Sequence, residues 1–271
     1  MKDVQSETDD RGIYIDIVGV SNVSVPLKIK DKINGSQVVQ ASVSMFVDLP
    51  KEQRGTHFSR FVRLLHNDVM EYHIDSDSIP TILQHIKKDL ESERSHIIVE
   101  FDYFITKKAP VSKLLNLLKI HCKFEGWSEN GGSQILMTVV VPYTSLCPCS
   151  KEISESGAHN QRSFASVTLD TSNYNLWFEE VVELVEQASS SPIFNILKRE
   201  DEKYVTELAY SNPRFVEDMV REISARLLEK SIDKFKIECR HEESIHQFDA
   251  FAKVIYGDWG DGTSNRSVKD E

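Results

Sequence analysis

Residues 133–170 of the chain read SQILMTVVVPYTSLCPCSKEISESGAHNQRSFASVTLD. Apolar and β-branched residues at 133–141 and 164–170 predict two strands at the ends of this stretch. The connection between them consists of polar and turn-forming residues, and it is far longer than the roughly two to five residues of a hairpin loop. Long connections of this composition are typical of functional loops. The stretch therefore predicts two sheet strands and, between them, the place of a site.

The rest of the second half continues with helices and strands. Residues 176–188 have the apolar spacing of an amphipathic helix, and a second helix is predicted from Pro213, in its first turn, to Leu228–Lys230. Strands are predicted at 232–239 and 247–256. The tail at 257–271 is polar and is predicted to be disordered.

The first half shows the same order of patterns. Two strands, two helices and two strands are predicted at 13–20 and 37–48, 58–73 and 79–91, and 96–106 and 117–127. These patterns predict an α+β fold of tandem β-β-α-α-β-β units with antiparallel sheets, at 13–128 and 129–256, after an N-terminal tail at 1–12. Antiparallel sheets with helices on one face leave edges and a face to bury, so we expect oligomers joined through the sheets.

Composition limits the class of protein. The chain has 271 residues, 40% of them hydrophobic, which is enough for a buried core. Its net charge of −11 and its isoelectric point near 5.4 argue against general binding to nucleic acid or anionic membranes. No apolar run approaches the roughly 18–20 residues that span a bilayer, and the start MKDVQSETDD lacks the features of a secretion signal. We therefore expect a cytoplasmic protein whose four cysteines are free thiols or thiolates.

The connection at 142–163 concentrates side chains that can bind a metal. Cys147, Cys149 and His159 offer two thiols and an imidazole in a segment with no apolar core of its own. One thiolate, one imidazole and one carboxylate would leave a tetrahedral position open for water, as in catalytic zinc sites. The alternative is a cysteine pair buried as small hydrophobic residues beside an unrelated surface histidine. Residues two apart along an extended segment point to opposite sides, which argues against both sulfurs binding one ion.

Several motifs in one order resemble the GTP cyclohydrolase type IB family. The connection supplies SLCPCSKEIS and GAHNQRS, and the other motifs are GSQ at 35–37, VDLP at 47–50, GTHFSRF at 55–61, DEKYVTELAY at 201–210, NPRFVED at 212–218 and ESIH at 243–246. The resemblance implies the tunnelling fold (T-fold), in which tandem units assemble through their sheets into barrels with active sites between subunits. A homo-oligomer, and specifically a tetramer, is therefore expected.

The resemblance also implies a reaction and a metal. GTP cyclohydrolase I is a hydrolase that opens the imidazole ring of GTP with water, releases formate and gives 7,8-dihydroneopterin triphosphate, the entry to folate (tetrahydrofolate) biosynthesis. One divalent ion, Zn, Mn or Fe, would be held by Cys147, His159 and Glu202, without an organic cofactor, and would lower the pKa of a bound water toward neutrality. Without the resemblance, the run REDEK at 199–203 would be interpreted as a solvated charged turn.

Three further residues receive catalytic roles from the resemblance. Cys149 is expected near C8 of the purine for nucleophilic or proton-transfer work, and a second metal ligand or a structural thiol is the alternative. Glu243 and His246 are expected beside the active site, as a proton relay or a phosphate contact. The sequence departs from the family at Phe248, where a second histidine is common, so a role that needs two histidines here is not supported.

Residues that bind the substrate are expected for the guanine base and for the triphosphate of GTP. Glu217 resembles the glutamate with which T-fold enzymes hold a purine or pterin, because a carboxylate suits the adjacent N1 and N2 donors of guanine. The alternative is an exposed first-turn glutamate favoured by the helix dipole. Cations and helix-terminal N–H groups suit the triphosphate. The residues that offer them, each of which could instead be an ordinary surface group, are His57, Ser59, Arg60, Lys151 and Arg162.

Three other functions remain open on the sequence. An archaeal-type GTP cyclohydrolase uses iron and gives a cyclic phosphate, and sequence patterns separate it poorly. The T-fold 7-cyano-7-deazaguanine reductase uses a cysteine and NADPH without an essential metal, and the segment that carries His159 argues against it. A non-enzymatic oligomer with structural zinc would need four protein ligands. His121 and His241 are assigned to structural or surface positions.

Overall fold

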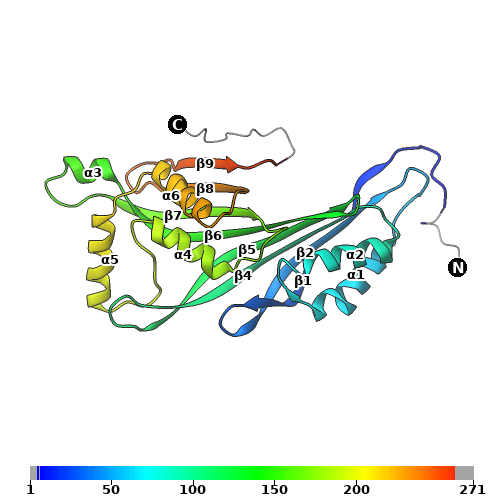
Figure 1. Ribbon diagram of the computed structural model, residues 1–271, viewed down its shortest axis with the longest axis horizontal. Helices are drawn as coiled ribbons and strands as arrows, with labels where there is room; N and C mark the ends of the chain where they lie inside the picture. The colour runs from blue at the N-terminus through cyan, green and yellow to red at the C-terminus, as the bar shows by residue number, and fades with distance from the viewer. Residues whose placement is uncertain (1–4, 6, 260–271) are drawn as a thin grey trace. The chain divides into compact units, whose positions relative to one another are not determined.

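The computed structural model of the chain describes residue 5 and residues 7–259 (Figure 1). Its elements are β1 (Ile15–Asp31), β2 (Gly35–Leu49), α1 (Phe58–Asn67), the 3-10 turn η1 (Val69–Glu71), β3 (His73–Ile74), α2 (Ile79–Leu90), β4 (Ser95–Lys108), β5 (Leu115–Glu129), β6 (Gly132–Leu146), α3 (Pro148–Ile153), β7 (Asn160–Asp170), α4 (Phe178–Ala188), α5 (Arg199–Ser211), α6 (Val216–Glu229), β8 (Phe235–His241) and β9 (Ala250–Tyr256). Two strands, two helices and two strands recur in each half, with η1, β3, α3 and α5 added. The predicted α+β class is confirmed.

Hydrogen bonds join the strands in the order β3-β1-β2-β4-β5-β6-β7-β8-β9. The pairs β1–β2, β2–β4, β7–β8 and β8–β9 are antiparallel, and the two-residue β3 lies parallel to β1. Strands β3 and β9 stand at the two ends of this order. Since β9 has no second neighbouring strand in the described part of the chain, its outer N–H and C=O groups can pair with a further strand.

Contacts divide the chain into two compact units. The first consists of Met1–Asp102, Cys122–Met137 and Asp170–Asn175, and the second of Tyr103–His121, Thr138–Leu169 and Leu176–Glu271. Strands β4, β5 and β6 each contribute residues to both units. The predicted tandem units at 13–128 and 129–256 follow chain order rather than these contacts, and that division stays a prediction.

In each compact unit, a pair of helices buries one face of its strands. In the first unit, α1 and α2 pack on each other and on β1 and β2, with Phe61 and Ile82 shielded from solvent. In the second, α4 and α6 pack on each other and α6 packs on β8 and β9, with Ile223 and Ile237 buried. Burial of each such side chain contributes about 1.5–3 kcal/mol. The apolar residues that alternate along the predicted strands therefore belong to the cores of the two units.

Strand β1 is longer than the predicted strand at 13–20. Its register with β2 shifts between Val20 and Val23, and Asn22 between them has a left-handed φ of 57°. Such a bulge interrupts the alternation by which a strand is recognised, so the continuation to Asp31 was not predicted. The helix predicted at 58–73 likewise ends early, at Asn67, and η1 follows it.

The charge run at 199–203 begins helix α5, and its residues are exposed except for Asp201. Asp201 is buried and accepts hydrogen bonds from the backbone N–H groups of Val111 (2.8 Å), Ser112 (2.9 Å) and Lys198 (3.0 Å). Burial alone would raise the pKa of Asp201, but a hydrogen bond from the Ser112 hydroxyl, together with these backbone hydrogen bonds, lowers it well below its usual value. The carboxylate thus fixes the start of α5 to the turn between β4 and β5.

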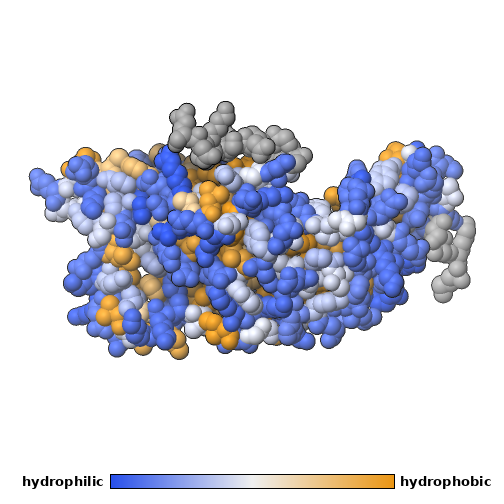
Figure 2. All heavy atoms as spheres, viewed as in Figure 1, coloured by the Kyte–Doolittle hydropathy of each residue, from blue (hydrophilic) through white to orange (hydrophobic). Residues whose placement is uncertain are grey.

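Some large apolar side chains remain on the surface. Figure 2 shows apolar patches between the hydrophilic side chains that cover most of the drawn face. On β5, Leu115 and Leu117 are 63% and 55% exposed, on the face opposite to the buried residues of that strand. An uncovered apolar sheet face of this kind is typical of a surface that packs against another chain.

The predicted tails are described only in part. Thr8 forms an isolated bridge with Gln53, whereas residues 1–4, 6 and 260–271 lie outside the described residues. No helix within residues 5 and 7–259 is long and apolar enough to cross a membrane.

Candidate active site

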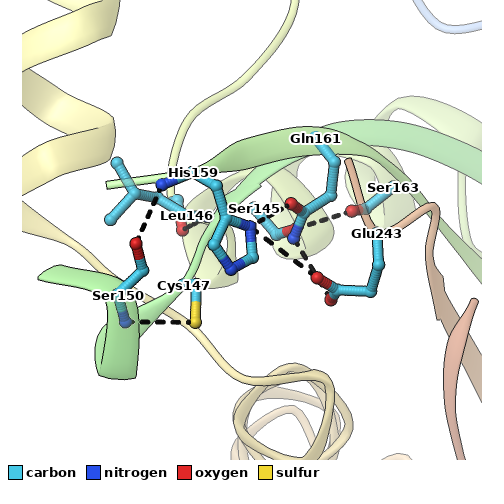
Figure 3. A network of polar contacts seen from close by, with 9 residues as sticks. Ser145, Leu146, Cys147, Ser150, His159, Gln161, Ser163 and Glu243 are labelled. Atoms are coloured by element: carbon cyan, nitrogen blue, oxygen red, sulfur yellow. Dashed lines mark hydrogen bonds and ion pairs between the residues drawn. The ribbon is translucent and has the colours of Figure 1, made fainter. Parts of the chain in front are cut away.

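The two residues predicted to bind a metal through sulfur and imidazole lie at adjacent strand ends. Strand β6 ends at Leu146, directly before Cys147, and β7 begins directly after His159. The backbone N–H of Cys147 donates a hydrogen bond to the carbonyl of His159 at 3.1 Å. This bond extends the pairing of β6 and β7 by one step, so the thiol and the imidazole stand on neighbouring strands (Figure 3).

Helix α3 follows Cys147 immediately, which corrects the expectation of an extended Cys-Pro-Cys segment. Pro148 stands in the first turn, where its missing N–H costs no hydrogen bond, and Cys147 is the N-cap. The Cys147 Sγ accepts the N–H of Ser150 at 3.4 Å, and the Ser150 hydroxyl accepts the N–H of His159 at 3.2 Å. Cys147 is partly buried, whereas Cys149 in the helix is exposed. The two cysteines therefore have different surroundings.

The return from α3 to β7 passes through Gly157, at a left-handed φ of 76°. No atom lies within 4 Å of the place that a Cβ would take at this residue. The glycine is therefore required by its backbone conformation rather than by lack of space. It lets the chain turn before it presents His159.

A row of polar side chains leads from His159 into the sheet (Figure 3). The Nδ1 of His159 lies 3.0 Å from the Oε1 of Gln161, and the Gln161 Nε2 donates to the Ser145 hydroxyl at 2.9 Å. The hydroxyls of Ser145 and Ser163 are 2.7 Å apart. Gln161 is 7% exposed, and both serines are fully buried. Alternate residues of β6 and β7 thus form a polar patch on the face that is otherwise core.

Glu243, two residues beyond the end of β8, completes this row. Its carboxylate accepts a hydrogen bond from the Gln161 Nε2 at 3.4 Å and lies 3.7 Å from the His159 Nδ1. The side chains of His159 and Glu243 are each 13% exposed. The structure therefore brings Glu243 to the segment between β6 and β7, residues 147–159. On the sequence, Glu243 is expected beside the active site.

The other carboxylates of the predicted site lie in first turns of helices. Glu202 is exposed at the start of α5, and Glu217 is exposed at the start of α6. Within residues 5 and 7–259, no three metal-ligating side chains are close enough to hold an ion. Cys147 and His159 stand at neighbouring strand ends, and Glu202 forms no such group with them among the described residues. The complete ligand set stays a prediction.

The remaining predicted side chains have varied surroundings. Lys151 reaches from α3 to α5, where its Nζ donates to the Tyr210 carbonyl at 2.6 Å and lies 4.5 Å from the centre of that ring. The N–H of His246 donates to the Glu243 carbonyl at 3.3 Å, and its ring stacks on Phe248 at 4.7 Å. The departure from the family at Phe248 therefore places an exposed ring beside His246.

Three of the predicted phosphate-binding residues belong to the first compact unit, whereas the cysteines and His159 belong to the second. His57 is the N-cap of α1, and Ser59 and Arg60 stand in its first turn. The Arg60 Nη1 donates to the Asp89 carbonyl at 3.1 Å and to the Glu91 carboxylate at 3.2 Å. His57 and Arg60 also line a cavity of about 120 Å³.

A larger cavity, of about 370 Å³, adjoins the segment between β6 and β7. Its lining includes Gly157, Asn160 and Arg162 from the segment and Phe194 and Tyr210 from the chain around α5. Arg162 alternates with Gln161 along β7, so the cavity and the polar row use different faces of this strand.

Sequence reasoning missed a second buried polar pair near the segment. His241, assigned there to a structural or surface position, is 2% exposed, and its Nε2 lies 3.0 Å from the hydroxyl of Tyr143. Burial lowers the pKa of His241 to about 4, against the opposing charge of Asp218. Burial also raises the pKa of Cys239, next to Tyr143, to about 12. The sequence contains one signal for this pair. Side chains two residues apart lie on one face of a strand, which groups residues 143, 145 and 147 along and just after β6 and residues 239, 241 and 243 along and just after β8.

Comparison with known proteins identifies close relatives. A model of the family described as type I GTP cyclohydrolase FolE2 matches residues 1–252. The chain is 46% identical over 256 residues to GTP cyclohydrolase FolE2 of Pseudothermotoga lettingae, which covers 94% of this chain and 98% of that protein. It is 47% identical over 258 residues to GTP cyclohydrolase FolE2 of Magnetococcus marinus, with coverages of 95% and 96%.

Solved structures with a similar fold are more distant in sequence. Uricase from Arthrobacter globiformis aligns with a TM-score of 0.54 at 7% identity, over 93% of this chain and 96% of that one. A hyperthermostable mutant of Bacillus sp. TB-90 urate oxidase aligns with a TM-score of 0.53 at 11% identity, over 89% and 98%. At this identity the likeness shows the fold alone, which is the predicted T-fold.

Proposed function

The chain belongs to the type I GTP cyclohydrolase FolE2 family, and we propose that its catalytic centre is built on the segment between β6 and β7. The enzyme is a hydrolase with GTP cyclohydrolase I activity, which opens the imidazole ring of GTP with water and gives formate and 7,8-dihydroneopterin triphosphate for folate biosynthesis. The hydrogen bond from Cys147 N–H to the His159 carbonyl is the observation that carries this placement. It puts a thiol and an imidazole on neighbouring strand ends.

We infer that Cys147, His159 and Glu202 hold one divalent ion, Zn, Mn or Fe. Thiolate, imidazole and carboxylate are the donor types that such ions prefer, and three of them leave a position open. The Cys147 sulfur accepts one N–H and keeps lone pairs available, and the exposed Glu202 belongs to the same compact unit. When bound, an ion of this kind makes water a nucleophile near neutral pH.

Proton transfer is assigned to Glu243, His246 and Cys149. Water that attacks C8 of the purine loses a proton, and the ring nitrogen that leaves C8 gains one. Glu243 is shielded from solvent and lies beside His159, so it is suited to accept the first proton. His246 follows three residues later and is suited to relay it, and the exposed thiol of Cys149 is suited to approach the purine ring.

Substrate binding is assigned to Glu217 and to the cations around the segment. The carboxylate of Glu217 is exposed and can accept both N1–H and N2–H of guanine. Arg162 lines the cavity of about 370 Å³ beside the segment, which supports a role for this guanidinium, together with Lys151, in holding phosphate. We propose that His57, Ser59 and Arg60 reach the triphosphate from a neighbouring subunit.

A homo-oligomer, and specifically a tetramer, is therefore part of the proposal. The outer edge of β9 and the exposed leucines of β5 support an assembly through the sheets. We further propose that this enzyme works in the cytoplasm without an organic cofactor and without a nucleic-acid or membrane partner.

The product of the reaction tests the proposed function. The protein is stripped of metal, loaded separately with Zn, Mn or Fe, and incubated with GTP, and the products are identified by mass spectrometry. We expect 7,8-dihydroneopterin triphosphate, whereas a cyclic phosphate would indicate the archaeal-type reaction. Absence of any pterin with all three metals would contradict the proposal.

A further inference from the structure

We propose that Gln161 fixes the tautomer of His159, holding a proton on Nδ1 and keeping Nε2 free to bind the metal. Gln161 is a positioning residue in this proposal, because it acts through His159 and touches neither metal nor substrate. The inference rests on the proposed function in one respect, the role of His159 as a ligand. The tautomer itself is a property of the metal-free protein.

The orientation of the Gln161 amide follows from its other neighbours. Its nitrogen atom carries two donors and its oxygen atom only accepts. The Gln161 Nε2 lies 2.9 Å from the Ser145 hydroxyl and 3.4 Å from the Glu243 carboxylate. An ionised carboxylate is an acceptor only, so the NH₂ group must be the end that faces Glu243. The opposite orientation would bring two acceptor oxygens together in a shielded site.

The fixed amide then determines the state of the imidazole. With the NH₂ group turned to Glu243, the Gln161 Oε1 faces the His159 Nδ1 at 3.0 Å. An oxygen can only accept in this contact, so Nδ1 must carry the hydrogen. The Glu243 carboxylate is 3.7 Å from the same nitrogen, which is too long for a competing hydrogen bond. A neutral imidazole has one N–H, and Nε2 is therefore left with its lone pair.

Burial prevents the amide from turning over. Gln161 is 7% exposed, and the Ser145 hydroxyl that it contacts is itself engaged with Ser163 in the core. Turning the amide would place its oxygen against the acceptor oxygens of Glu243, where water cannot compensate. Histidines that bind metals commonly donate their other N–H to such a partner, and loss of that partner lowers metal affinity about 10- to 100-fold.

Two substitutions test the role of the Gln161 amide oxygen separately from that of its NH₂ group. Gln161→Met has a similar length but no acceptor for the His159 Nδ1, and we expect its affinity for Zn, measured by chelator competition, to fall about 10- to 100-fold. Gln161→Glu keeps an acceptor opposite Nδ1 but puts a second carboxylate oxygen against Glu243, so we expect its Zn affinity to fall less than that of Gln161→Met. Gln134→Met is the matched control, because the Gln134 amide donates to Asp170 at 2.9 Å within the first compact unit.

The tautomer can be read directly in the metal-free protein. Long-range ¹H–¹⁵N spectra of ¹⁵N-histidine-labelled wild type, with His159→Asn to assign the signal, should show His159 with the hydrogen on Nδ1. A hydrogen on Nε2 would overturn the proposal, as would Zn affinity in Gln161→Met equal to that of the wild type. If Gln161→Met fails to fold, the wild-type spectrum still decides the question. Lack of GTP turnover with the Nδ1–H tautomer present would instead count against the proposed function.

Discussion

Cys147 and Cys149 stand two residues apart and have different environments. Cys147 is the partly buried N-cap of α3, beside His159, and Cys149 is an exposed thiol in the helix. We therefore predict that Cys147→Ser lowers bound metal at least tenfold, whereas Cys149→Ser keeps its metal and loses turnover at least 100-fold. Metal content by mass spectrometry and the rate of GTP conversion test both statements. Equal metal loss in the two variants would contradict the separation of roles.

Glu217 is predicted to hold the guanine edge of GTP. Removing the charge from a paired hydrogen bond costs about 1.5–3 kcal/mol, so Glu217→Gln should raise KM for GTP about 10- to 100-fold without changing the metal content. Glu222→Gln is the matched control, because this half-buried carboxylate of the same helix pairs with Arg226 at 3.7 Å. Unchanged KM in Glu217→Gln would remove this residue as the base anchor.

His241 is predicted to make the protein less stable in acid. Its pKa is about 4 in the folded protein and 6.5 in its ordinary state, so between these values the unfolded chain binds a proton that the native state does not. Stability is therefore complete above pH 6.5 and falls as the pH decreases, by about 2 kcal/mol between pH 7.5 and pH 5. Urea unfolding of metal-free protein measures this loss. His241→Asn should show a smaller decrease, and an equal decrease would show that other groups cause it.

The site residues could be predicted from the sequence only in part. Cys147 and His159 were recognisable because soft ligands are concentrated in one connection, and Glu243 because its motif resembles the family. Gln161 was not recognised as a partner of His159, since a lone glutamine carries no signal until the start of β7 is known. The sequence left His241 as either a structural or a surface residue, because a histidine at a strand end is equally compatible with burial and exposure.

At the scale of elements, helix α5 depends on a single buried carboxylate. Asp201 accepts hydrogen bonds from Val111, Ser112 and Lys198, and its loss would leave these backbone donors without their partner. We predict that Asp201→Ala lowers the thermal unfolding midpoint by several degrees and weakens metal binding, because Glu202 follows it in the same turn. Glu200→Ala, at an exposed neighbouring position, should leave the midpoint within about 1 °C. A normal midpoint in Asp201→Ala would contradict this role.

Sequence patterns predicted the strands with one buried face more accurately than the short or mostly exposed helices. Regular alternation predicted β4, β5 and β8 to within a few residues, because each has one buried face. Helix α5 buries only Asp201 and Ala209, so its sequence has little apolar periodicity. Helix α3 has no buried residue and begins with proline, and its six residues were absorbed into the predicted loop. Two of the elements that carry predicted site residues, α3 and α5, thus have the weakest periodic signal.

At the scale of the whole molecule, the predicted phosphate residues belong to two different compact units. Arg60 and His57 lie in the first unit, and Lys151 and Arg162 lie in the second. If neighbouring subunits complete each site, light scattering should give a mass of roughly four times 31.0 kDa. Arg60→Ala should then lower activity about tenfold or more without changing that mass. A monomer with full activity would contradict this arrangement.

Mixing subunits tests the shared site more specifically. Arg60→Ala and Cys149→Ser subunits are each expected to be poorly active alone. If one subunit supplies Arg60 and its neighbour supplies Cys149, mixed oligomers contain some complete sites and should regain a measurable part of the activity. No recovery in mixtures with proven subunit exchange would place both residues in the same subunit.

Release of formate from GTP labelled with ¹³C at C8 tests the central claim most directly. The metal-loaded wild type should form one labelled formate for each pterin, followed by NMR, and the metal-free protein should form none until the ion is restored. His159→Asn should remain inactive when the ion is added. Equal formate release from metal-free wild type, or from His159→Asn, would contradict a metal centre on the segment between β6 and β7.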